Sequence, residues 1–211
     1  MAEAGFDAAE HAKAARLHRI LLEELHHRLK NNLAVVAAIT SQTLRTSPNL
    51  EEARVTLSER LSALGRIHDL LLRTGWANAT IDLILRTATQ PFGPRRFLIE
   101  SEAVMVGSRT AQSLTLILHE LATNAAKHGA LSNSDGRVEI TATVDASGQR
   151  LSIRWTERDG PLVREPQRKG LGTRLIVDSL PSQLGATTRL TFPPSGVVFE
   201  VDMPVDSLAT E

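Results

Sequence analysis

The chain has no cysteine, no long hydrophobic run and no excess of charge of either sign. The absence of cysteine excludes disulfide bonds, thiolate catalysis and cysteine-based metal sites. No apolar stretch approaches the roughly 20 residues of a membrane-spanning helix, and the N-terminus has acidic residues where a signal peptide has an apolar region. The 24 basic and 24 acidic residues cancel, which argues against a broad nucleic-acid surface. We expect a cytoplasmic protein with no membrane insertion and no nucleic-acid partner.

The remaining composition is that of a packed protein. Hydrophobic residues make up 42% of the 211 positions, which is enough for the core of one large domain or two small ones. The pattern changes near residues 74–80. We therefore predict two domains, a helical one over residues 1–75 and a mixed one over residues 80–211.

The first domain is predicted to form two long helices, over residues 8–46 and 50–73, separated by Ser-Pro-Asn. A bundle seam is expected along the second helix, where steps of four and three residues connect Leu57, Leu61, Leu64, His68 and Leu71. Two such helices form an antiparallel hairpin, which cannot cover its own apolar stripe. We therefore predict a homodimer, in which two hairpins make a four-helix bundle.

The second domain mixes helical and strand periodicities. Helices are expected over residues 81–89 and 172–180, with a longer helix between them that contains HELATNAAKHG. Alternating apolar and polar residues predict strands over residues 96–106 (with a turn), 137–144, 151–156, 188–192 and 197–203. Mostly antiparallel strands with helices in about 130 residues predict a two-layer α/β sandwich. The whole chain is therefore of the α+β class.

The segment HELATNAAKHG, residues 119–129, is the first candidate site. On a helix Glu120, Asn124 and Lys127 recur at i, i+4 and i+7 and share one face. The opposing face is apolar and consists of Leu114, Ile117, Leu118, Leu121 and Ala125. An amide oxygen and a carboxylate are hard ligands for Mg²⁺, and lysine is a point charge for phosphate. The pattern suits a metal-bound polyphosphate, although the solvated face of an amphipathic helix has the same pattern.

The segment ELHHRLKNNLAVVAAI, residues 24–39, is the second candidate site. On a helical wheel one sector about 120° wide contains Leu21, Leu25, Leu29, Leu33, Val36 and Ile39. His27 points away from this sector, whereas His26 flanks it. A solvent-facing imidazole beside Arg28 and Lys30 can accept a phosphoryl group. The alternative is an ordinary exposed histidine.

Two turns are further candidates. RWTERDGP, residues 154–161, places Glu157 at the end of a strand, and Trp155 suits a core position better than a base-stacking one. RKGLGTRLI, residues 168–176, opens a helix with Gly170 and Gly172, so that backbone N–H groups can face a phosphate. Each signal is weak alone, because a tight turn explains Gly-x-Gly equally well.

Together the four segments occur in the order of the H, N, G1 and G2 boxes of sensor histidine kinases. In detail they resemble the HWE histidine kinases, named for a histidine in the N box and a Trp-x-Glu in the G1 box, here His119, Trp155 and Glu157. Residues 60–76, RLSALGRIHDLLLRTGW, resemble the second bundle helix of that family. The resemblance covers residues 20–204. It implies a helical dimerisation and phosphotransfer domain followed by an ATP-binding domain of the Bergerat (GHKL ATPase) type.

The resemblance implies a two-component signalling kinase that uses Mg-ATP to phosphorylate itself on His27. The phosphoryl group would then pass to an aspartate of a response-regulator receiver domain. Many histidine kinases have an acid directly after the phosphoacceptor, but this chain has Arg28. Glu120 is therefore the candidate general base. Asn31, one helical turn after His27, is a candidate for phosphatase action or simply an exposed polar residue.

The resemblance also implies a nucleotide site. Asn124 would hold the Mg²⁺ of Mg-ATP, Lys127 and His128 would lie nearest the phosphates, and Glu157 would bind the adenine amino group. The implied site also contains His119, Glu120, Asp159, Gly160, Gly170, Leu171, Gly172 and Thr173. A short lid over residues 162–169 would close it.

Two features depart from the family pattern. Asp159 stands where the family usually has glycine, which costs backbone freedom and brings a carboxylate towards the triphosphate, although aspartate tolerates positive φ better than most residues. Fewer than about 25 residues precede the H box, too few for a sensory domain. We therefore expect the signal to come from a separate sensor or upstream partner, from a short N-terminal extension of the bundle, or from a further domain. The alternatives to a kinase are a histidine phosphotransfer relay with weakened ATP binding and a non-enzymatic dimeric adaptor.

Overall fold

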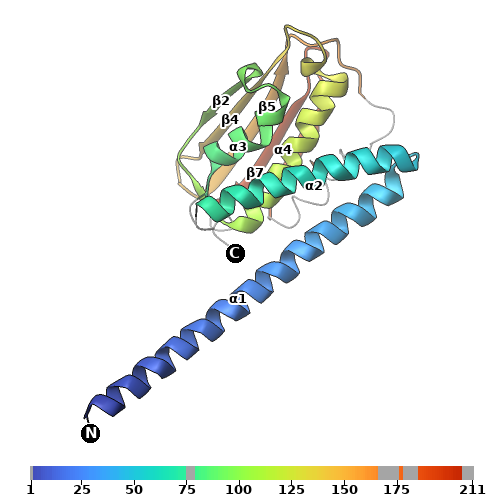
Figure 1. Cartoon of the computed structure of the whole chain (residues 1–211). Helices are drawn as coiled ribbons and strands as arrows, with labels where there is room; N and C mark the ends of the chain where they lie inside the picture. The colour runs from blue at the N-terminus through green and yellow to red at the C-terminus, as the bar shows by residue number, and fades with distance from the viewer. Residues whose placement is uncertain (1, 75–78, 166–175, 178–184, 206–211) are drawn as a thin grey trace. The chain divides into compact units, whose positions relative to one another are not determined.

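The computed structural model describes residues 2–74, 79–165, 176–177 and 185–205 (Figure 1). Two long helices, α1 (Ala2–Thr46) and α2 (Leu50–Arg73), precede a mixed α and β region, as predicted. The chain forms two compact units, residues 1–57 and 58–211, so α2 from Ser58 onward belongs to the second unit. Within the described ranges, no helix has the length and apolar character needed to cross a bilayer.

The first unit contains α1 and the beginning of α2. Asn49 starts α2 as a side-chain cap, since its Oδ1 accepts a hydrogen bond of 2.8 Å from the backbone N–H of Glu52. Along α1 the predicted apolar sector is largely uncovered, because Leu25, Leu29 and Leu33 are 62%, 56% and 59% exposed. The chain leaves this apolar stripe of α1 open to solvent.

The second unit is built on a five-stranded sheet in the order β2-β4-β5-β7-β6. Its strands are β2 (Phe97–Ser101), β4 (Arg137–Val144), β5 (Arg150–Arg158), β6 (Thr187–Thr191) and β7 (Val198–Pro204). Only the pairing of β2 with β4 is parallel. The short strands β1 (Ala79–Thr80) and β3 (Met105–Val106) form a separate antiparallel pair. The predicted segment 96–106 therefore splits into two strands that belong to different sheets.

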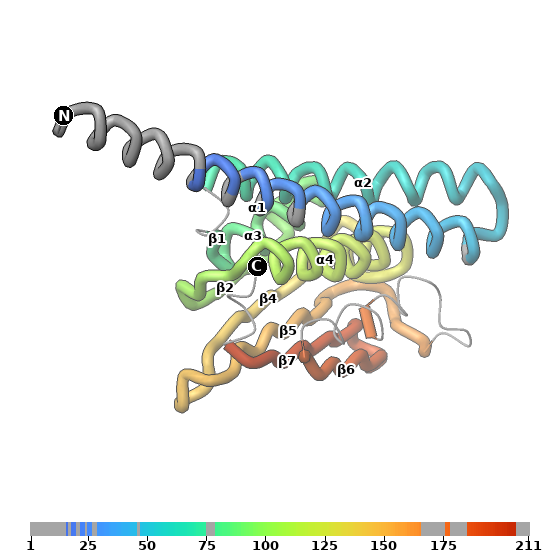
Figure 2. The backbone as a smooth tube through the Cα atoms, turned by 90° about the horizontal axis from the view of Figure 1, so that it is seen from below, coloured from blue at the N-terminus to red at the C-terminus, as the bar shows by residue number. Residues whose placement is uncertain are grey.

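Two helices, α3 (Ile81–Thr89) and α4 (Ser108–His128), cover one face of this sheet (Figure 2). Alternate strand residues point into the layer between them and are buried: Val138, Ile140, Ala142, Leu151, Ile153, Trp155, Phe199, Val201 and Met203. The predicted two-layer α/β sandwich is confirmed. The helix expected over residues 172–180 lies outside the described residues, apart from positions 176 and 177.

The buried stripe of α2 differs from the predicted seam. Leu64 and Leu71 are buried as expected, but Leu61 is 36% exposed. Within the second unit, the fully or nearly buried positions of α2 are Arg60, Ala63, Leu64, Ile67 and Leu71. The prediction followed the spacing of four leucines and a histidine, whereas the stripe includes a buried arginine whose charge is compensated by a partner on another helix.

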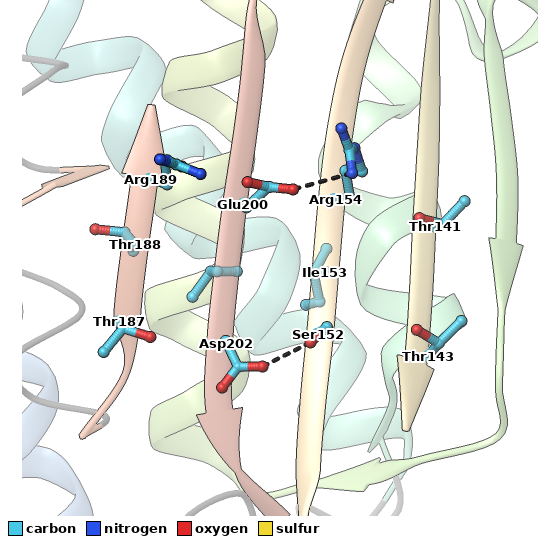
Figure 3. A pocket seen from close by; sticks show the side chains of 11 residues that line it. Thr141, Thr143, Ser152, Ile153, Arg154, Thr187, Thr188, Arg189, Glu200 and Asp202 are labelled. Atoms are coloured by element: carbon cyan, nitrogen blue, oxygen red, sulfur yellow. Dashed lines mark hydrogen bonds and ion pairs between the residues drawn. The ribbon is translucent and has the colours of Figure 1, made fainter. Parts of the chain in front are cut away.

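The sheet face that the helices do not cover is polar (Figure 3). A shallow groove of about 680 Å³ lies there, lined by residues such as Thr141, Ser152, Arg154, Glu200 and Asp202. Arg154 pairs with Glu200 at 3.0 Å, and Ser152 donates a hydrogen bond of 2.6 Å to Asp202. None of the predicted site residues within the described ranges lines this groove.

Candidate functional site

The candidate site is organised by α4, the helix that carries the segment 119–129. Its predicted apolar face is confirmed, because Leu114, Ile117, Leu118, Leu121 and Ala125 are all at most 2% exposed. Asn124, Lys127 and His128 are exposed on the last turns of the helix. The negative end of the helix dipole favours cations such as Lys127 at this position. A solvent-accessible amide and a cation therefore lie together beside the C-terminal end of α4.

Glu120 lies one turn before Asn124, but unlike Asn124 it is buried. Its carboxylate accepts two hydrogen bonds from the Arg60 guanidinium of α2, 2.6 Å from Nε to Oε1 and 2.9 Å from Nη2 to Oε2. Arg60 is 2% exposed and Glu120 is 7% exposed. This is a bidentate, charge-assisted pair, which is the strongest geometry between these groups. Arg60 was not among the residues predicted for the site. The signal that could have found it is its helical spacing from Leu64 and Ile67, which places a charged residue in line with buried apolar ones.

His119 is buried on a neighbouring side of α4. It is five residues from Asn124, which places the two side chains about 140° apart around the helix axis. Its ring lies 5.5 Å from that of Phe92, and among the described residues its Nδ1 has no hydrogen-bond partner. Burial lowers the pKa of the imidazole to about 4, and the cations Arg66, Arg60 and Lys127 act in the same direction while Glu120 opposes them. His119 is therefore a neutral side chain at physiological pH.

A cleft of about 380 Å³ adjoins His119. It lies between α2, α4 and the short 3-10 helix η1 (Gln90–Phe92), and it is lined by Ser58, Glu59, Ser62, Arg66, Pro91, Phe92, His119, Thr123, Ala126 and Lys127. Asn124 does not line this cleft. The structure thus places His119 and Asn124 on separate surfaces of α4, with Lys127 exposed at the cleft.

Glu157, the last buried residue of β5, lies beside the C-terminal end of α4. It is 2% exposed, and its Oε2 accepts a hydrogen bond of 2.7 Å from the backbone N–H of Ala130. Burial raises the pKa of the Glu157 carboxyl, and the Ala130 N–H opposes this shift. Gly129 is in direct contact with this carboxylate, so that a Cβ at Gly129 would overlap Oε2. The close packing fixes Glu157 at a defined place near the exposed end of α4.

In the turn after β5, Asp159 has the positive φ that the sequence analysis expected aspartate to tolerate. This residue adopts φ = +56°, the left-handed region that favours glycine and is tolerated by aspartate. Its carboxylate forms an ion pair with Arg137, and its carbonyl accepts a hydrogen bond of 3.1 Å from Asn133. Gly160 packs against the backbone of Ala130, where a Cβ would be 2.5 Å from Cα. The charge of Asp159 is therefore paired on the protein.

Trp155 lies two residues before Glu157 on β5. It is fully buried and meets Phe97 edge to face at 5.9 Å. The expectation that this tryptophan is a core residue is confirmed.

Several predicted site residues cannot be placed with this group. His27 and Asn31 lie on α1 in the other unit, where Asn31 is exposed and only the helical backbone of His27 is described. Gly170, Leu171, Gly172 and Thr173, with lid positions 166–169, lie outside the described residues. The structure therefore gathers Asn124, Lys127, His128, Glu157 and Gly160 around the end of α4, whereas His27 and Asn31 belong to the other unit.

The side chains at this end of α4 fit a magnesium ion that is carried by a ligand. Within the described ranges no group of three or more histidine or acidic side chains could hold a metal ion. Mg²⁺ usually keeps several waters and is bound through one or two protein oxygens together with phosphate groups. The exposed amide of Asn124 can supply one such oxygen.

Comparisons with known proteins concern the family and the fold of the chain. Residues 24–103 match the family model described as HWE histidine kinase. The chain is 40% identical over 204 residues to a blue-light-activated histidine kinase of Brucella anthropi, and 39% identical to that of Brucella ovis; each alignment covers 94% of this chain and 42% of the relative. The chain thus spans less than half the length of these curated relatives.

Solved structures share the fold. The histidine kinase domain of the Erythrobacter litoralis EL346 blue-light activated histidine kinase superposes with a TM-score of 0.58 at 21% identity, covering 86% of this chain and 99% of that domain. The longer EL346 structure gives a TM-score of 0.62 at 23% identity, over 87% of this chain and 58% of that one. The chain therefore shares the fold of these histidine kinase structures.

Proposed function

Because the chain belongs to the HWE histidine kinase family, we propose that it is a Mg-ATP-dependent protein-histidine kinase that phosphorylates itself on His27. The observation that carries this proposal is the cluster at the end of α4. There the exposed amide of Asn124, the exposed Lys127 and the buried carboxylate of Glu157 lie within one small region. This combination suits the metal, the phosphates and the base of one nucleotide.

Each residue has a role that its surroundings support. Asn124 binds Mg²⁺ through its amide oxygen, and Lys127 and His128 contact the phosphates. Glu157 has one carboxylate oxygen on the Ala130 N–H, and the carboxylate keeps lone pairs for the amino group of adenine. When bound, Mg²⁺ neutralises part of the phosphate charge. Gly170, Leu171, Gly172 and Thr173 lie outside the described residues and remain predicted residues of the nucleotide site.

The transfer step follows from positioning and charge. The ATP domain moves until the γ-phosphorus is in line with Nε2 of His27. The new N–P bond forms as the bond to the β-phosphate oxygen breaks, so that ADP leaves and the proton of the imidazole passes to water. The phosphoryl group then passes to an aspartate of a response-regulator receiver domain. We further propose that Asn31 positions water for phosphatase action.

The same proposal includes a homodimer. The exposed leucine stripe of α1, made of Leu22, Leu25, Leu29 and Leu33, is the kind of surface that a second copy covers in a four-helix bundle. A separate sensor or upstream partner would supply the input signal.

Incubation with γ-labelled ATP and Mg²⁺ tests the proposed kinase. We expect acid-labile label on the wild-type chain and none on His27→Gln or Asn124→Asp. His26→Gln is the matched control and should still be labelled, because the neighbouring imidazole lies about 100° away around the helix. An unlabelled wild type that accepts phosphoryl from a phosphorylated receiver domain would support a relay protein instead, and failure of both reactions would support an adaptor.

A further inference from the structure

The buried pair between Arg60 and Glu120 lies at the border of the proposed nucleotide site. Glu120 is four residues before Asn124 on α4, which corresponds to one turn, or about 6 Å along the axis. Both partners are almost completely buried, and the two hydrogen bonds measure 2.6 and 2.9 Å. They join α2 and α4 within one compact unit. The negative charge nearest to Asn124 on this helix is therefore held by an arginine from a different helix.

The loss of Arg60 would leave the Glu120 carboxylate buried without a partner. A buried carboxylate without its guanidinium keeps its charge only at a high desolvation cost. Beside a nucleotide site it would also repel the triphosphate, because unit charges at such separations interact strongly in a partly buried environment. Conversely, a carboxylate that accepts two hydrogen bonds from one guanidinium cannot rotate towards a bound phosphate.

We propose that Arg60 is a positioning residue that fixes the Glu120 carboxylate and cancels its charge beside the Mg-ATP site. The inference rests on the proposed function, since it concerns the same nucleotide. It also changes the role of Glu120: with both oxygens on Arg60, the carboxylate shapes the wall of the site and is not the proton acceptor in this arrangement. The helix α2 thereby becomes part of the nucleotide site.

Four variants test this role by isothermal titration with the magnesium complex of the non-hydrolysable analogue AMP-PNP. Arg60→Gln leaves the carboxylate unpaired, and we expect its affinity to fall about tenfold or more. Arg60→Lys keeps the charge but cannot form the bidentate pair, and it should give an intermediate affinity. The double variant Arg60→Gln with Glu120→Gln removes the orphan charge and should restore affinity to within about threefold of wild type.

Arg54→Gln is the matched control on the same helix. Arg54 pairs with Glu51 at 2.6 Å, but both side chains are about 70% exposed, and we expect wild-type affinity because exposed pairs contribute little. Circular dichroism melting curves show which variants fold. If Arg60→Gln does not fold, the double variant decides, because a folded double variant with near wild-type affinity supports the proposal.

Three results would overturn the inference. These are wild-type affinity in Arg60→Gln, a double variant that binds as weakly as Arg60→Gln, and equal losses in Arg60→Gln and Arg54→Gln. If Arg60 had only a structural role, the double variant would bind as weakly as Arg60→Gln. The reason is that the double variant removes the repulsion between the unpaired carboxylate and the triphosphate but keeps the packing defect at position 60. A wild type that binds no magnesium nucleotide would refute the proposed function together with this inference, whereas binding without the expected order of variants would refute this inference alone.

Discussion

Replacing His119 by glutamine should remove much of the acid sensitivity of the second unit. His119 is 5% exposed and its pKa in the folded chain is about 4, compared with the ordinary value of 6.5. A histidine with a depressed folded pKa binds its proton more readily in the unfolded chain. The stability that it contributes is therefore fully present above pH 6.5 and is lost as the pH falls towards 4.

The magnitude follows from the two pKa values. One pKa unit corresponds to about 1.4 kcal/mol, so the whole shift is worth about 3 kcal/mol. Between pH 7 and pH 5 the wild type should lose about 2 kcal/mol of unfolding free energy through this group alone. Glutamine fills a similar volume and does not titrate. The variant His119→Gln should therefore not show this loss of about 2 kcal/mol of unfolding free energy between pH 7 and pH 5.

Urea unfolding at pH 7 and pH 5, followed by tryptophan fluorescence to which the buried Trp155 contributes, measures the effect. The groups that act on His119 are Arg60, Arg66, Lys127 and Glu120, and they remain in the variant. Other titrating groups remain as well, including Glu157, whose raised pKa shifts stability in the opposite direction. The difference between wild type and variant therefore isolates His119.

Thr123→Val is the matched control, because Thr123 lines the same cleft and does not titrate. It should keep the wild-type loss of stability between the two pH values. The reasoning would be refuted if His119→Gln lost as much stability as the wild type on acidification, or if Thr123→Val reduced the loss to the same extent.

Two further predictions concern the turn after β5 and the surface of α1. Asp159→Ala should lower the unfolding free energy by about 1 kcal/mol, because alanine at φ = +56° is strained. Asp159→Gly loses the same exposed ion pair with Arg137 without this strain and should be near wild type, and equal losses in both variants by urea unfolding would contradict this prediction. Leu29→Glu places a charge in the exposed leucine stripe and should convert a dimer to a monomer in light scattering, whereas a wild type that is already monomeric would contradict the dimer.

Much of the fold could be predicted because periodicity records burial directly. The strand over residues 137–144 has the predicted bounds, and α2 begins and ends as expected. The division of the segment 96–106 between two sheets was not predicted, because two short strands that join different sheets give the same local pattern as one strand with a turn. The seam of α2 was partly wrong because an arginine occupies a buried position, and hydrophobic patterns do not include paired charges.

The sequence by itself determined the chemistry that this protein carries. Local spacing placed an acid, an amide and a lysine along α4, and the order of four segments indicated the family. Only the tertiary structure decided how these residues differ from one another. Asn124 and Lys127 are exposed, Glu120 is bound by Arg60, and Asp159 is paired with Arg137. The physical reason is that ion pairs and desolvation depend on side chains 22 and 60 residues apart in the chain, a separation at which sequence spacing carries no geometric information.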